Sequence, residues 1–295
     1  MEERLADQFE RLNKPPLEYL DGIEEFYNAY YKVSEMQDRH AHLLSYLASD
    51  FWCVVLCTSI LHDYSDQEIE ALKELLVKFY YQNWVAEQKE PKKQTNCNII
   101  KALKEKQSVE NIASTIVKKY LDDDSNKITQ HFREKLKDDH LYEKHKKSSK
   151  NSWLRPILIL VEYFMSDDPR PKRIEKNDFH IEHILPQNPD SSSQWVKDFS
   201  EEERGLYTHS LANLTLLGGK KNTKALSQAL NQDFKEKKEI YMGKLVALDN
   251  KKTFKVMTCY KMTIDIVHNY TEWTPKSLEK RKEELIQIIE SVLTL

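Results

Sequence analysis

The chain has 295 residues, of which 40% are apolar and 32% charged, and its formal net charge is −3. This composition predicts a folded protein of about two domains and argues against disorder. The charge excludes a globally basic nucleic-acid binder, although a local basic groove is enough for DNA contact.

Glycine is scarce, because the chain contains only 5 and none lies between Gly22 and Gly205. Phosphate-cradling loops and Rossmann turns depend on glycine, so the sequence argues against both. The glycine-free stretch is rich in Leu, Glu, Lys and Gln, which favour helix. We therefore expect only helices from Leu17 to about Phe164.

Nothing in the sequence predicts a membrane or secreted protein. The longest apolar run, Phe51 to Leu61, is far shorter than the ~20 residues of a membrane span. The N-terminal residues are acidic and lack the layout of a signal peptide. The four cysteines form no Cys-x-x-Cys pair, which favours free thiols in a reducing compartment. We expect a cytoplasmic protein without a membrane partner.

Helix-start signals occur along the first half of the chain. Ser65 with Glu68 forms a capping box ahead of a one-sided apolar pattern. Ser108 is a further helix cap, followed by an apolar face that includes Ile112. These signals predict a bundle of amphipathic helices.

A change of composition predicts a domain boundary. Residues 153–164 have the apolar character of a buried helix, and residues 166–176 hold two prolines and many charges. The sequence therefore predicts an all-helical scaffold over residues 1–165 and a second domain over residues 166–295.

Two β-strands are expected after the boundary. Residues 178–185 favour strand and end at Pro186, which forces Leu185 into an extended conformation and stops pairing. Residues 213–217 form the second candidate, closed by Gly218-Gly219.

Helices are expected around the strands. Ser200 and Glu203 form a second capping box, another helix begins near Asn222, and Thr274 caps the last helix. The expected helix-face residues are Phe234, Lys238 and Tyr241 in one helix and Leu285, Ile288, Ile289 and Val292 in the last.

Four polar residues around the strands have the chemistry of phosphodiester hydrolysis. They are Glu182, His183, Asn213 and Asn222. Histidine, with an ordinary pKa near ~6.5, can take a proton from an attacking water at neutral pH. Mg²⁺ neutralises charge at the departing oxygen and prefers oxygen ligands, which Glu182 and Asn222 supply.

Strand geometry complicates this site. Successive side chains point to opposite faces, so Glu182 and His183 cannot both enter one site from a regular strand. The turn forced by Pro186 supplies a distortion that lets them converge. His180 lies on the same face as Glu182 and is a candidate for an indirect contact, and the Asn213 amide can tie a loop's backbone and orient the histidine.

These residues resemble a known family. The segment FHIEHILPQ (residues 179–187) is similar to the first strand and loop of an HNH, or His-Me finger, nuclease, LANLTLL (211–217) to its second strand and KKNTK (220–224) to the start of its metal-finger helix. Together with Trp195, the residues Phe234, Lys238 and Tyr241, and Trp273-Thr274 ahead of Arg281, residues 170–295 resemble the C-terminal nuclease domain of the GmrSD family, type IV restriction enzymes that cut modified DNA.

The resemblance implies a ββα-metal site embedded in helices. His183 would be the general base, Asn213 the structural asparagine of the catalytic site, and Glu182 and Asn222 the ligands of one Mg²⁺, for which Mn²⁺ can substitute. Glutamate stands where many HNH proteins have aspartate or histidine. No cysteine pairs flank the site, so no structural zinc is expected.

The resemblance also implies partners. Modified double-stranded DNA would be the substrate. We find no counterpart of the N-terminal nucleotide-hydrolysing sensor domain of GmrSD enzymes, so we expect it in a longer protein or in a separate subunit.

Several site residues have simpler alternatives. Lys220, Lys221 and Lys224 are either solvated or in contact with phosphates. Arg281 either contacts DNA or has a structural role opposite Trp273. Asn213 could be a plain turn residue, and Asn222 a helix cap without metal.

The sequence thus predicts a metal-dependent DNA endonuclease, the nuclease part of a restriction or phage-defence system. One alternative is a non-catalytic helical protein whose degenerate finger binds nucleic acid. The other is a helical protein-interaction subunit that does not contact DNA.

Overall fold

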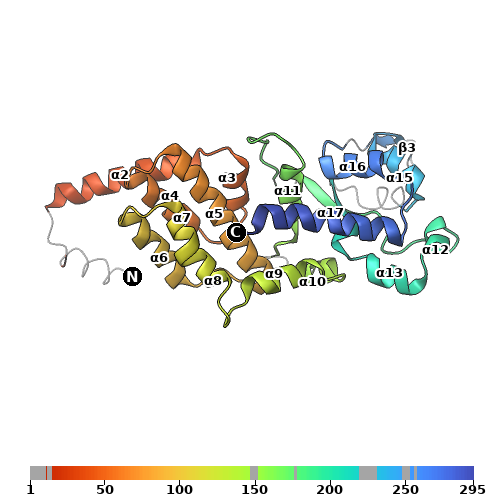
Figure 1. Cartoon of the computed structure of the whole chain (residues 1–295). Coiled ribbons are helices and arrows are strands. Elements are labelled where there is room, and N and C mark those ends of the chain that lie inside the picture. Colours follow the sequence, from red (N-terminus) through yellow and green to blue (C-terminus); the bar gives the residue numbers. More distant parts are fainter. Residues whose placement is uncertain are drawn as a thin grey trace.

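The computed structural model describes residues 11, 15–146, 152–175, 178–218, 231–247, 253–255 and 258–295. Helices dominate this part of the chain, which confirms the expected mainly α fold. Its β-structure consists of two short antiparallel pairs of strands. The molecule is elongated, with a helical bundle at one end and the strands toward the other (Figure 1).

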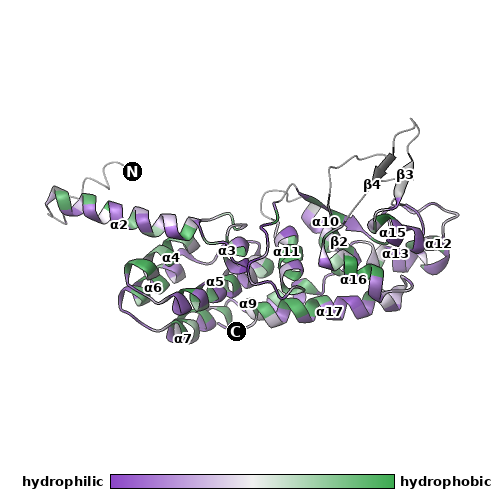
Figure 2. Ribbon diagram, turned by 90° about the horizontal axis from the view of Figure 1, so that it is seen from above, coloured by the Kyte–Doolittle hydropathy of each residue, from purple (hydrophilic) through white to green (hydrophobic). Residues whose placement is uncertain are grey.

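The N-terminal helices form the bundle. Helix α2 projects from it (Figure 2). Its apolar side chains include exposed residues such as Leu17, which is 71% exposed. In the described part of the chain, no helix combines the length and apolar character needed to cross a membrane. The bundle helices are α2 (Pro16–Ser34), α3 (Arg39–Leu44), α4 (Phe51–Leu61), α5 (Asp66–Glu87), α6 (Lys93–Lys104), α7 (Val109–Ile112) and α8 (Lys119–Leu121), with a π-helical turn over Ala113–Lys118.

Three helices connect the bundle to the strands. They are α9 (Ile128–Leu136), α10 (Leu141–Lys146) and α11 (Leu154–Phe164). Most of α11 is buried, as its apolar composition predicts. The segment after it lies against the bundle, because the Tyr46 hydroxyl donates to the Ile174 carbonyl at 2.7 Å.

The helix starts predicted within the described residues are confirmed. Both capping boxes are formed, by Ser65 with Glu68 at α5 and by Ser200 with Glu203 at α13 (Glu201–Tyr207). The hydroxyl of Thr274 accepts from the Ser277 N–H at the start of α17 (Pro275–Leu293). Local hydrogen bonding by short polar side chains is sufficient to set these boundaries.

Both expected strands are present. β1 (Phe179–His183) pairs antiparallel with β2 (Leu214–Gly218), with His183 opposite Leu214. A 3-10 turn over Leu211–Asn213 precedes β2, and α12 (Gln194–Asp198) and α13 lie between the strands. The pair matches the two strands of the expected ββα arrangement, but the arrangement itself stays a prediction, because the helix expected near Asn222 lies outside the described residues.

The rest of the described chain packs around the antiparallel β1–β2 pair, which is called the hairpin below. It comprises α15 (Phe234–Tyr241), the strand pair β3 (Leu245–Ala247) and β4 (Thr253–Lys255), α16 (Lys261–Asn269) and α17. The Glu162 carboxylate accepts from the backbone N–H groups of Lys261 and Met262 at the start of α16. Burial raises the pKa of Glu162. The β3–β4 pair was not expected, because three-residue strands show too little alternation to be recognised.

The hydrophobic interior consists of two clusters. The larger one continues from the bundle through α11 to β1, β2 and α17, and the smaller one underlies the end of the hairpin and includes Ile184, Leu185 and Trp195. Helix α17 joins the two ends of the molecule, since Gln82 in α5 donates to its Leu293 carbonyl at 2.6 Å. Its buried stripe is Leu278, Arg281, Leu285, Ile289 and Leu293, while Ile288 and Val292 are half-buried.

Candidate functional site

The hairpin carries Glu182 and His183 to the end of β1. Glu182 lies opposite Thr215 and His183 opposite Leu214. The alternation of a strand sends the two side chains to opposite faces, and both are nonetheless buried, with 9% and 6% of their surface exposed. Each is therefore enclosed by its own set of neighbours.

Helix α15 encloses Glu182. The Lys237 ammonium donates to Oε1 of Glu182 at 2.9 Å, and the Tyr241 hydroxyl donates to the same atom at 3.3 Å. Burial lowers the pKa of Lys237, and the neighbouring Glu182 charge opposes that shift. Burial and the Glu182 charge both raise the pKa of Tyr241. These contacts hold the Glu182 carboxylate beside the Lys237 ammonium in the protein interior.

Lys237 also holds the backbone after Glu182. Its ammonium donates to the carbonyls of His183 and Ile184, each at 2.7 Å. In a regular strand consecutive carbonyls point in opposite directions, so two of them cannot approach one nitrogen. The backbone therefore leaves strand geometry at His183, ahead of Pro186.

Aromatic rings surround His183. Its imidazole makes an edge contact with Tyr142 of α10, with ring centroids 4.3 Å apart, and a second with His209 at 5.5 Å. Its Nδ1 lies 3.2 Å from Nε2 of Gln187. The backbone N–H of Tyr142 donates to the His209 carbonyl at 3.0 Å, which connects α10 to this site. The ring is thus held from three sides.

Asn213 ties the loop after β1 to the turn before β2. Its Oδ1 accepts from the Leu185 N–H at 2.7 Å and from Nε1 of Trp273 at 3.2 Å. Its Nδ2 donates to the carbonyls of Leu185 and Thr208, both at 2.9 Å. The side chain is fully buried. This is the backbone-tying geometry that the sequence predicts for Asn213, whereas a catalytic part for it stays a prediction.

Arg281 is a structural neighbour of the hairpin. It is 2% exposed, and it donates to the Ala212 carbonyl and, at 2.9 Å, to the Leu214 carbonyl. Its guanidinium lies 5.8 Å from the Trp273 ring centroid, and burial lowers its pKa to about 10. This geometry matches the structural alternative, since a guanidinium turned toward backbone carbonyls in the interior does not present itself to a phosphate.

The remaining predicted site residues are one histidine on β1 and four residues outside the described part of the chain. His180 is half-buried on β1, two residues before Glu182 and on the same face. Asn222, Lys220, Lys221 and Lys224 lie outside the described residues. Their grouping with Glu182 and His183 therefore stays a prediction.

Sequence reasoning missed Lys237. It named Lys238, whose ammonium instead donates to the Tyr270 carbonyl at 2.7 Å. Lys237 and Tyr241 are four positions apart, which places both on one helix face, and that spacing was the available signal. Tyr142 was missed because it comes from α10, in the region expected to be a separate scaffold.

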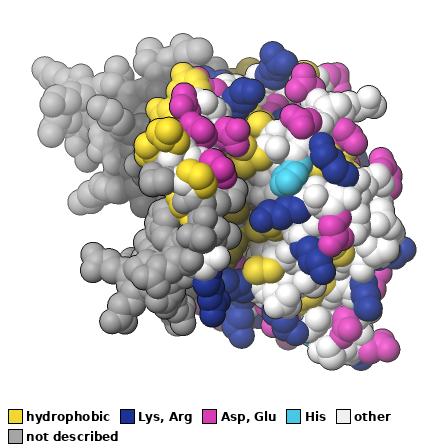
Figure 3. Space-filling model, turned by 90° about the vertical axis from the view of Figure 1, so that its left-hand side faces the viewer, with side chains coloured by type: hydrophobic (Ala, Val, Ile, Leu, Met, Phe, Trp, Pro, Cys, Tyr) yellow, Lys and Arg dark blue, Asp and Glu magenta, His cyan; other side chains and the backbone are white. Residues whose placement is uncertain are grey.

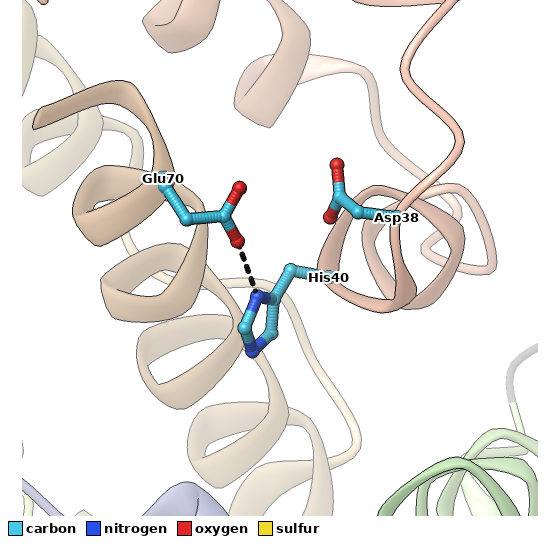
Figure 4. Close-up of side chains that lie close together, drawn as sticks. All are labelled: Asp38, His40 and Glu70. Atoms are coloured by element: carbon cyan, nitrogen blue, oxygen red, sulfur yellow. Dashed lines mark hydrogen bonds and ion pairs between the residues drawn. The ribbon is translucent and has the colours of Figure 1, made fainter. Parts of the chain in front are cut away.

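A second cluster of similar composition lies in the bundle. Asp38, His40 and Glu70 bring three ligand atoms within 4.8 Å of one another (Figure 4). Nδ1 of His40 lies 2.9 Å from Glu70, and the Lys73 ammonium contacts Asp38 and, at 2.6 Å, Glu70. A positive charge therefore already lies against both carboxylates of this cluster.

Comparison with known proteins identifies one part of the chain. The family model described as GmrSD restriction endonucleases, C-terminal domain, matches residues 126–288, which is more than half of the chain. The matched segment includes α9 to α11, the hairpin and most of α17. No curated protein and no solved structure matches the chain.

Proposed function

The chain belongs to the GmrSD restriction endonucleases through their C-terminal domain, and from this premise we propose that it hydrolyses DNA phosphodiester bonds at the end of the β1–β2 hairpin. One observation carries the proposal: Glu182 and His183 leave β1 at a point where Lys237 and Asn213 fix the backbone. A nuclease needs a base and an anionic ligand held in fixed geometry beside the same phosphate.

In this proposal His183 is the general base. A neutral imidazole accepts the proton of the attacking water as the bond to phosphorus forms. Tyr142, His209 and Gln187 restrict the ring, so that one nitrogen keeps its direction during the transfer. Asn213 holds the next residues of the loop and thereby the position of the imidazole.

Glu182 and Asn222 would hold one Mg²⁺, with Mn²⁺ as its substitute. The Glu182 carboxylate suits this hard cation because Mg²⁺ prefers oxygen ligands. Among the described residues, the hydrogen bonds of Glu182 go to Oε1, so Oε2 is the oxygen we assign to a metal. Once bound, the cation would supply charge neutralisation at the departing oxygen.

The substrate in this proposal is modified double-stranded DNA in the cytoplasm. Lys220, Lys221 and Lys224 would contact its phosphates next to the hairpin. On the outer end of the bundle, Lys and Arg side chains are interspersed with Asp and Glu (Figure 3), which does not favour a polyanion there. A nucleotide-hydrolysing sensor domain or subunit would recognise the modification.

Plasmid nicking tests the proposal. Wild-type protein is expected to cut DNA with Mg²⁺ or Mn²⁺ and to stop when EDTA is added. His183→Ala should lose the activity, whereas His268→Ala, at an exposed histidine of α16, should keep it. Full activity in purified, folded His183→Ala protein would overturn the assignment of the base.

A second candidate function has one observation in its favour. Because Oε1 of Glu182 is already bonded to Lys237, the finger could bind DNA without holding a metal. That protein would bind DNA with strong salt dependence and no metal requirement, and it would not nick plasmid under any divalent cation.

A further inference from the structure

Lys237 is a lysine without solvent contact. Its exposed fraction is 0%, although its neighbours along the short helix α15, from Lys235 to Glu239, are charged. An ammonium is costly to bury unless acceptors surround it. Three oxygens do so here: Oε1 of Glu182 at 2.9 Å, and the carbonyls of His183 and Ile184 at 2.7 Å each. All three belong to consecutive residues.

The chain after β1 is therefore held at two adjacent points. Lys237 holds the carbonyls of His183 and Ile184, and Asn213 holds Leu185 through both its N–H and its carbonyl. Among the described residues, the Asn213 side chain hydrogen-bonds to backbone groups and to Nε1 of Trp273. Lys237 differs, because the same nitrogen also contacts the Glu182 carboxylate.

We propose that Lys237 is the positioning residue that fixes the Glu182 carboxylate relative to the His183 backbone. The inference rests on the proposed nuclease function and deepens it. One nitrogen bonded to both groups fixes the carboxylate relative to the backbone that carries the base. It also occupies Oε1, which leaves Oε2 as the oxygen assigned to the metal.

The Glu182 and His183 side chains leave β1 toward opposite faces, so the bend of the backbone at His183 decides how the two groups are placed relative to each other. Without the ammonium, the His183 and Ile184 carbonyls lose their shared donor, and this bend loses its support from α15. The lysine therefore couples the bend of the backbone to the placement of the carboxylate.

The first test compares the same substitution at adjacent lysines. Lys237→Met removes the ammonium and keeps a similar length of side chain, and Lys238→Met is the matched control in the same helix. Lys237→Met is expected to lower kcat for DNA cleavage by about 100-fold and to change KM for DNA by less than about threefold. Lys238→Met should change both by less than about threefold.

A second readout does not depend on cleavage. Amide hydrogen exchange over residues 183–187 should become about tenfold faster in Lys237→Met and stay unchanged in Lys238→Met. If Lys237→Met fails to fold, the double variant E182Q/K237M replaces it, because removing both charges avoids an unpaired buried carboxylate. Its exchange over these residues should then exceed that of Glu182→Gln alone.

The outcomes separate the two proposals. If wild-type protein cleaves DNA while Lys237→Met shows wild-type kcat and exchange, the positioning role is overturned and the nuclease stands. If wild-type protein does not cleave, the nuclease proposal fails, and the exchange data still decide whether Lys237 fixes the loop. Equal exchange in E182Q/K237M and Glu182→Gln would also contradict the proposal.

Discussion

Two clusters in this molecule combine carboxylate, histidine and a buried lysine, yet they differ in what the lysine holds. In the bundle, Lys73 contacts two carboxylates, Asp38 and Glu70, and His40 bonds to the second of them. At the hairpin, Lys237 contacts one carboxylate and two backbone carbonyls. In the first cluster the lysine pairs with side-chain carboxylates, whereas in the second it also holds the backbone of a loop.

The difference shows that composition alone does not identify a site. The bundle cluster has the larger number of metal-type ligands, but the Lys73 ammonium already contacts both of its carboxylates. The hairpin cluster is poorer in ligands and lies inside the segment that matches the restriction endonuclease domain. The backbone geometry around a ligand therefore carries more information than the ligand count.

The sharpest contrast comes from one substitution made in both clusters. Glu182→Gln keeps an acceptor for Lys237 but removes the negative charge, so cleavage should fall by about 100-fold or more. Glu70→Gln makes the same change in the bundle and should alter the rate by less than about threefold. Steady-state cleavage rates of the two purified variants check this. Equal losses would erase the distinction between the clusters.

Asn213→Ala should affect both stability and activity. It leaves the buried N–H and carbonyl of Leu185 without partners, which costs about 3 kcal/mol of unfolding free energy. Urea unfolding measures the loss. Asn269→Ala is the control, because it removes an exposed hydrogen bond to Asp265 and should cost less than about 0.5 kcal/mol. A negligible cost at Asn213 would contradict its role as the tie of the loop.

Lys73→Met should destabilise the bundle without stopping cleavage. Burial acts to raise the pKa of Asp38, but hydrogen bonds from Lys73 and the Ala41 N–H outweigh it and hold that pKa below 3.8. A lowered folded pKa stabilises the protein above pH 3.8, and that stability is lost as pH falls through the folded pKa. The variant should lose about 2 kcal/mol of unfolding free energy near neutral pH. Its unfolding free energy, measured in urea, should also fall less steeply than that of the wild type as the pH becomes acidic. An unchanged pH dependence would show that Lys73 does not hold Asp38.

The smallest effect is expected from His145, which lies between the bundle and the hairpin. Burial lowers its pKa from 6.5 to about 4, and its ring packs edge-on against Trp153 at 4.5 Å. The unfolded chain binds more protons between these values, so stability falls as pH drops from 6.5 to about 4. Thermal unfolding of His145→Gln should lose this slope, and His268→Gln should keep it. A wild-type slope in His145→Gln would assign the effect to another group.

How much the sequence predicted depended on the range of the interaction. The capping boxes and both strands were predicted, because short polar side chains and proline act within a few residues. Asn213 was predicted as a backbone tie from its residue type, although its partner Leu185 lies 28 positions earlier in the chain. Lys237 was not, because its contacts join α15 to residues more than fifty positions earlier. Tyr142 was missed because its ring contact crosses the expected division between two domains.

The location of a bound Mn²⁺ tests the central claim most directly. In crystals of the inactive His183→Ala variant grown with Mn²⁺ and DNA, anomalous scattering should place the ion about 2–2.5 Å from Oε2 of Glu182. An ion bound instead between Asp38 and Glu70, with the hairpin cluster unchanged beside the DNA, would contradict the account.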